Sequence, residues 1–114
     1  MIRVIFHMRN TQYLGCQIEG HSGLAPSGSD ILCAAVSALS QTAVIGLEAY
    51  ALGKFESEIR DNGFLRIQLH DAASEEVLHD SQIILRTLHL GLEAIASEYR
   101  KHIKIALQEV NGHD

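Results

Sequence analysis

A histidine and a cysteine, His21 and Cys33, lie on either side of a loop rich in glycine and serine. A thiolate is a strong nucleophile, and an imidazole within hydrogen-bond reach can accept its proton and later donate it to a leaving group. The pair therefore suggests cysteine-dependent acyl transfer, such as peptide hydrolysis. The alternatives are a small core cysteine and a surface histidine, and the residue types alone leave both interpretations open.

Asp30 predicts the start of a helix that would hold the Cys33 sulfur in its first turn. Aspartate is a favoured N-cap residue, and the dipole of a helix start lowers the pKa of a nearby thiol. An imidazolium at His21 would lower that pKa further. Ser37 follows Cys33 by one turn, so its hydroxyl is expected near the sulfur. Backbone N–H groups of the helix start or the loop are the expected donors to an oxyanion.

The elements that position these residues follow from the spacing of apolar side chains. Residues 2–9 and 13–19 alternate apolar and polar positions and predict a hairpin of two strands. Leu14, Cys16 and Ile18 are expected on the buried face of the second strand. The chain is therefore expected to run from this hairpin through His21 and the loop into the predicted helix.

The remainder of the chain predicts two helices and three more strands. They are a helix over residues 30–52 ended by Gly53, a hairpin that turns at residues 61–63, a helix over residues 74–101 and a strand over residues 103–110. The order β-β-α-β-β-α-β predicts a single α+β domain over residues 1–114. Its two layers are a mixed, mostly antiparallel sheet and two helices packed on it.

The second helix carries one apolar stripe and few other signals. Arg100 and Lys101 are expected in its last turn, where they would complement the helix dipole. His79 and His89 are expected at its surface or boundary. The nearly uncharged helix over residues 30–52 should bury one side on the sheet and cover another with a second subunit.

Composition excludes several classes of function. A net charge of −5 with nine scattered basic residues argues against direct binding of nucleic acid. No apolar run is expected to span a membrane, and the N-terminal residues lack the pattern of a secretory signal, so a cytoplasmic location is predicted. Cys16 is expected to pack in the core, although a redox sensor would need it as the resolving partner of Cys33. No motif predicts a metal site or a cofactor.

The run from Gly20 to Ser37, "GHSGLAPSGSDILCAAVS", closely resembles the signature of the ribosomal-processing cysteine proteases, the Prp family. The similarity covers the whole chain in length and element order. It implies a homodimeric bacterial endopeptidase that removes the N-terminal extension of a large-subunit ribosomal protein. By position, Cys33 would be the nucleophile and His21 its partner, with Asp30 and Ser37 as supporting residues.

The resemblance also assigns the loop between the two reactive residues. Gly23, Ala25, Pro26 and Gly28 would belong to a segment that moves when the substrate peptide binds, and Pro26 should stiffen its middle. The alternative is a non-catalytic ribosome-assembly or peptide-binding module that keeps the motif.

Overall fold

The computed structural model describes residues 1–23, 30–71 and 73–110. Its elements follow the predicted order β-β-α-β-β-α-β, which is confirmed. They are β1 (Ile2–Arg9), β2 (Gln12–Glu19), α1 (Ile31–Tyr50), β3 (Phe55–Arg60), β4 (Phe64–Leu69), α2 (Glu75–Glu98) and β5 (Ile103–Glu109).

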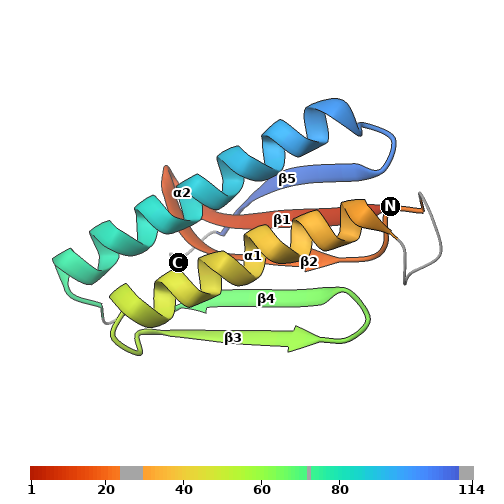
Figure 1. Ribbon diagram of the computed structural model, residues 1–114. Helices are drawn as coiled ribbons and strands as arrows, with labels where there is room; N and C mark the ends of the chain where they lie inside the picture. The colour runs from red at the N-terminus through yellow and green to blue at the C-terminus, as the bar shows by residue number, and fades with distance from the viewer. Residues whose placement is uncertain (24–29, 72, 111–114) are drawn as a thin grey trace.

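The five strands form one mixed sheet in the order β3-β4-β2-β1-β5. The pairs β1–β2, β2–β4 and β3–β4 are antiparallel, whereas β5 runs parallel to β1. Both helices lie side by side on one face of this sheet, which makes the predicted two-layer architecture (Figure 1). The end of the central strand β2 and the start of α1 lie at the same end of the sheet, so the topology brings the residues around the loop to a single place (Figure 1).

The core fills the space between the helices and the sheet. Strand side chains alternate between buried and exposed positions, and the helices contribute one stripe each. The largest fully buried apolar side chains come from strands and helices alike: Phe6, Ile2, Leu47, Ile67, Leu85, Leu92 and Val4. This packed layer fixes α1 against the sheet and with it the start of the helix.

A β-bulge in β2 changes which of its residues face the core. His7 pairs with Gly15 and Met8 pairs with Tyr13, so Leu14 is the extra residue of the bulge. Tyr13 is therefore buried, and the prediction that Leu14 shares the buried face is wrong. The expected burial of Cys16 and Ile18 is confirmed.

Helix α2 differs from its prediction at His89 and at its end. His89 is buried rather than at the surface, because its two ring nitrogens lie 2.7 Å from the Tyr13 hydroxyl and 3.2 Å from a Glu93 carboxylate oxygen. The helix ends at Glu98, so Arg100 and Lys101 follow it and do not occupy its last turn. The surface position of His79 is confirmed.

Helix α1 ends earlier than predicted, and by length and composition it could cross a membrane. It ends at Tyr50, and Leu52 takes a left-handed φ of 51° one residue before Gly53. Among the described residues, α1 is the one helix that is long and apolar enough to cross a membrane. The prediction that no apolar run reaches that length is therefore wrong. Leu32, Val36 and Leu47 are buried against the rest of the chain, as in the core helix of a globular domain, which passes the same test.

Candidate active site

Gly20 turns the chain out of β2 and sets the position of His21. Its φ is 95°, and a Cβ atom there would collide with the Met1 carbonyl oxygen, so only glycine fits. The Met1 amino group in turn donates a hydrogen bond to the His21 carbonyl oxygen. His21 therefore leaves the sheet on a fixed path, with its exposed side chain beside the start of α1.

Asp30 caps α1 as predicted and fixes Cys33 in the first turn. Its Oδ1 atom accepts hydrogen bonds from the backbone N–H groups of Leu32 and Cys33, each at 3.1 Å. Its carbonyl oxygen accepts the bond from the N–H of Ala34, also at 3.1 Å. Three of the N–H groups of the first turn are thus occupied. They are not available as the oxyanion donors that we expected from the helix start.

Within the described residues, the Cys33 sulfur lies close to His21, Asp30 and Ser22. The His21 Nδ1 atom lies 3.8 Å from it, and the Asp30 Oδ2 atom lies at 3.1 Å, where it accepts from the thiol. The backbone N–H of Ser22 donates to the sulfur at 3.3 Å. The structure therefore brings His21, Asp30 and Cys33 together, as the sequence predicts, and adds Ser22, which no sequence pattern indicated.

The electrostatics of this cluster oppose ionisation of the thiol. Burial raises the pKa of Cys33, and the hydrogen bond and negative charge of Asp30 raise it further, although the backbone N–H and the side chain of Ser22 lower it. The prediction of a lowered thiol pKa is therefore wrong. The main reason is burial of the sulfur; in addition, the Asp30 carboxylate accepts from the helix-start N–H groups itself and places its own charge against the sulfur.

The same contacts favour the ionised form of Asp30. The hydroxyl of Ser22 donates to its Oδ2 atom, and this bond is the largest cause that lowers the pKa of Asp30 to about 2. Backbone N–H groups at the start of α1 lower that pKa further, whereas burial raises it. Asp30 is therefore a fixed carboxylate at neutral pH, and the neighbouring thiol is protonated.

A pocket of about 450 Å³ opens over the sulfur. His21, Asp30, Cys33 and Ser37 line one side of it, and the β3–β4 hairpin supplies the other side with Ile59, Arg60, Asp61, Gly63, Phe64 and Leu65. Sequence reasoning missed the hairpin, because its residues have no motif and reach the site only through the strand order.

Gly63 at the hairpin turn supports the His21 ring. Its φ is 83°, and a Cβ atom at this position would lie 3.3 Å from the His21 Cε1 atom and 2.9 Å from the Gly20 carbonyl oxygen. The turn and the ring are thus in close contact, so the hairpin limits where the imidazole can lie.

The other site residues predicted from the sequence are Ser37 and the residues of the loop. Ser37 lines the pocket, but no hydrogen bond joins its hydroxyl to the Cys33 sulfur within the described residues. Gly23 is exposed with a φ of 80°, whereas Ala25, Pro26 and Gly28 lie outside the described residues.

The second cysteine is buried in the core, away from solvent. Cys16 is a free, buried thiol, and burial raises its pKa to about 12. Within residues 1–23, 30–71 and 73–110, no group of three or more His, Cys, Asp or Glu side chains is placed to hold a metal ion. The chemistry of the described residues therefore concentrates on Cys33 and its neighbours.

Comparison with known proteins gives a consistent match. A family model described as Cysteine protease Prp matches residues 1–104. The chain is 32% identical over 92 residues to Ribosomal processing cysteine protease Prp of Staphylococcus aureus. This match covers 77% of this chain and 80% of that protein. It is 24% identical over 95 residues to the protein of the same name from Bacillus subtilis, with coverage of 81% and 83%.

A solved structure shares the fold over nearly the whole chain. It is the ribosomal processing protease Prp of S. aureus in complex with a covalently linked product peptide. The TM-score is 0.82 with 25% sequence identity, and the match covers 95% of this chain and 100% of the other.

Proposed function

The chain belongs to the Cysteine protease Prp family and is therefore a cysteine protease, and from this premise we propose that it removes the N-terminal extension of a large-subunit ribosomal protein. The observation that carries the proposal is the approach of His21 Nδ1 to within 3.8 Å of the Cys33 sulfur at the wall of an open pocket. The relatives named for ribosomal processing, and the relative with a linked product peptide, support a peptide of this kind as the substrate.

The proposed reaction uses Cys33 as nucleophile and His21 as proton carrier. The thiol proton passes to His21 Nδ1 while the sulfur attacks the scissile carbonyl carbon, which gives a tetrahedral oxyanion. Collapse breaks the C–N bond, and the imidazolium gives its proton to the leaving amine. His21 then takes a proton from water, the hydroxide oxygen attacks the thioester, and the sulfur leaves and recovers the proton.

The position of the thiol proton determines when this chemistry begins. The proton is directed at Asp30 Oδ2 at 3.1 Å, whereas the His21 nitrogen is at the longer distance of 3.8 Å. A thiolate beside a fixed carboxylate is unfavourable, so proton transfer to His21 is expected together with attack on a bound peptide. Ser22 N–H is the donor that supports the negative sulfur during this step.

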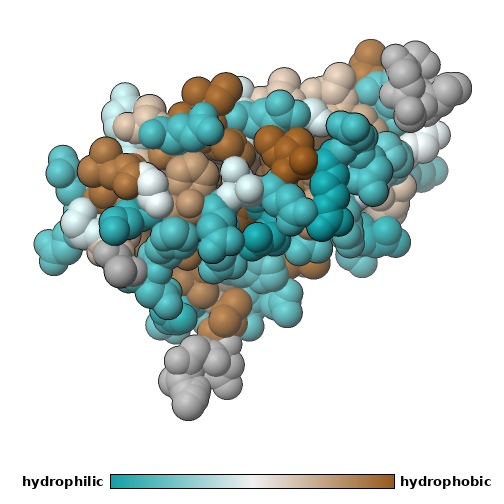
Figure 2. Space-filling model, turned by 90° about the horizontal axis from the view of Figure 1, so that it is seen from below, coloured by the Kyte–Doolittle hydropathy of each residue, from teal (hydrophilic) through white to brown (hydrophobic). Residues whose placement is uncertain are grey.

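Apolar side chains on α1 support the proposal of a homodimer. Ile31, Ile45, Tyr50 and Leu52 are exposed at or near this helix, which carries Glu48 as its only charged residue. Figure 2 shows the molecule from the side of β3, where hydrophobic groups are scattered among hydrophilic ones. A second copy that contacts α1 would cover these exposed side chains. Light scattering tests this proposal: we expect the wild-type protein to be a dimer and the Ile45→Glu variant to be a monomer.

The alternative function is a peptide-binding module without catalysis. The raised pKa of the Cys33 thiol favours it, because a protonated sulfur is a poor nucleophile. Both functions predict binding of the peptide, but only the protease predicts a new N-terminus on the product.

Mass spectrometry of the products separates the two functions. The substrate is a synthetic peptide that carries the N-terminal extension and the first residues of the mature ribosomal protein, and a scrambled peptide is the control. We expect one cleavage site in the native peptide and none in the scrambled one. Binding of the native peptide without any cleavage would favour the non-catalytic module.

A further inference from the structure

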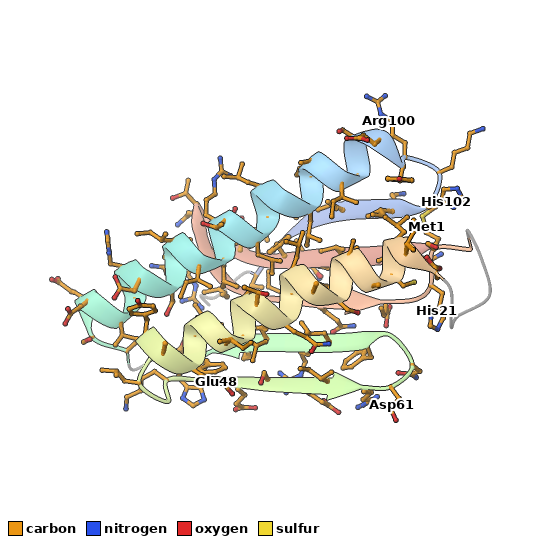
Figure 3. The ribbon with its side chains drawn as sticks, in the orientation of Figure 1. Met1, His21, Glu48, Asp61, Arg100 and His102 are labelled. Atoms are coloured by element: carbon orange, nitrogen blue, oxygen red, sulfur yellow. The ribbon has the colours of Figure 1, made fainter. Side chains whose placement is uncertain are left out.

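His102 makes a contact that reaches the active site from the opposite end of the chain. Its Nδ1 atom lies 2.8 Å from the carbonyl oxygen of Ser22, 80 residues away in sequence. A carbonyl oxygen only accepts, so the ring nitrogen carries a proton and donates it. Figure 3 shows His102, Met1 and His21 at the same end of the sheet, beside the start of α1.

Ser22 connects this contact to the reactive sulfur. Its backbone N–H donates to the Cys33 sulfur at 3.3 Å, and its hydroxyl donates to the Asp30 carboxylate. Its carbonyl oxygen accepts from His102. Ser22 is buried and directly follows His21, so its backbone position sets both the N–H that faces the sulfur and the path of the His21 main chain.

His102 is itself well anchored. Its N–H donates to the Tyr99 carbonyl oxygen at 2.8 Å, and its own carbonyl oxygen accepts from the N–H of Ile2 at 2.8 Å. The residue thus joins the end of α2 to the start of β1, immediately before β5. Because the His102 backbone is anchored in this way, its ring can hold the Ser22 carbonyl oxygen in one place.

We propose that His102 is a positioning residue for the Cys33–His21 pair, which acts through the Ser22 backbone and touches neither the sulfur nor the substrate. This inference rests on the proposed function for its catalytic consequence. His102 is not among the residues that line the pocket, so its loss should lower kcat and leave KM nearly unchanged.

The test compares three replacements of His102. His102→Asn places an amide N–H close to the position of Nδ1–H and should restore the contact, whereas His102→Ala removes it and His102→Gln moves the donor outward. Loss of one neutral hydrogen bond predicts a roughly three- to tenfold fall in kcat for the Ala and Gln variants. We expect the Asn variant to stay within about twofold of wild type. His79→Ala, at an exposed site on α2, is the matched control.

A second readout does not depend on proteolysis. Iodoacetamide modification of Cys33 at fixed pH should slow in the Ala and Gln variants, because a misplaced Ser22 N–H no longer supports the thiolate, and the Asn variant should recover the wild-type rate. If wild type modifies normally but cleaves no peptide, the proposed function fails while the role of His102 is still tested.

Two results would overturn the inference. One is a folded His102→Ala or His102→Gln variant with wild-type kcat and modification rate. The other is an equal loss in the Asn and Gln variants, which would show that the donor at the Nδ1 position is irrelevant. Should the Ala variant fail to fold by circular dichroism, the comparison of Asn with Gln decides alone.

Discussion

Replacement of Asp30 by asparagine should make the Cys33 thiol more reactive. The Oδ1 atom of an asparagine can still accept the N–H groups of Leu32 and Cys33, so the helix cap and the position of the sulfur are kept. What changes is the group at the Oδ2 position. A carboxylate oxygen that accepts from the thiol becomes an amide N–H that can donate to a thiolate.

The size of the effect follows from the geometry. Asp30 Oδ2 lies 3.1 Å from the sulfur, and repulsion between two unit charges at that separation in a water-like dielectric changes an ionisation equilibrium about tenfold. Below the thiol pKa, the rate of alkylation is proportional to the thiolate fraction. Asp30→Asn should therefore react with iodoacetamide about tenfold faster than wild type at neutral pH and low salt.

The assay follows intact mass over time in excess iodoacetamide, with circular dichroism to show that the variant is folded. Asp61→Asn is the matched control, because it removes a carboxylate that lines the same pocket from the hairpin without contact to the sulfur. A folded Asp30→Asn protein that reacts at the wild-type rate or more slowly would refute the assignment of Asp30 as the group that opposes thiol ionisation.

Three further predictions concern stability and access. Folding lowers the pKa of Asp30 from 3.8 to about 2, so the ionised carboxylate contributes fully to the stability of the folded protein above pH 4. This contribution is lost as the pH falls toward 2, and an acid titration by circular dichroism should therefore show a smaller loss of stability in Asp30→Asn than in wild type over that interval. Gly63→Ala should lower the free energy of unfolding in urea by about 1–2 kcal/mol and should lower the rate of cleavage, because the added methyl group displaces His21. A wild-type free energy of unfolding together with a wild-type cleavage rate would contradict the close contact between Gly63 and His21. Cys16 should resist iodoacetamide until urea unfolds the chain, and peptide mapping that finds it modified in the folded protein would disagree with its burial.

The sequence predicts the element order and the cap of α1 because both depend on local patterns. Alternating strands, a long apolar helix and an aspartate before it are each visible within a few residues. The hairpin of β1 and β2 then leads His21 back toward the start of α1, so the approach of His21 to Cys33 follows from topology and chain length.

The missed features depend on contacts between distant residues. The bulge at Leu14 breaks a two-residue period that alternation assumes to be uniform, and burial of His89 requires Tyr13 from another element as its partner. The raised pKa of the Cys33 thiol depends first on burial of the sulfur and then on the Asp30 carboxylate, and the sequence shows neither the burial nor the direction of that carboxylate. In the structure its second oxygen faces the sulfur, and no sequence spacing shows which way that oxygen points.

Cleavage of the extension peptide by the variants Cys33→Ala, His21→Ala and the double variant tests the central claim most directly. If the sulfur and the imidazole act as one unit, each single variant loses essentially all activity and the double variant loses no more. Product formation by a folded Cys33→Ala protein at the wild-type rate would contradict the account.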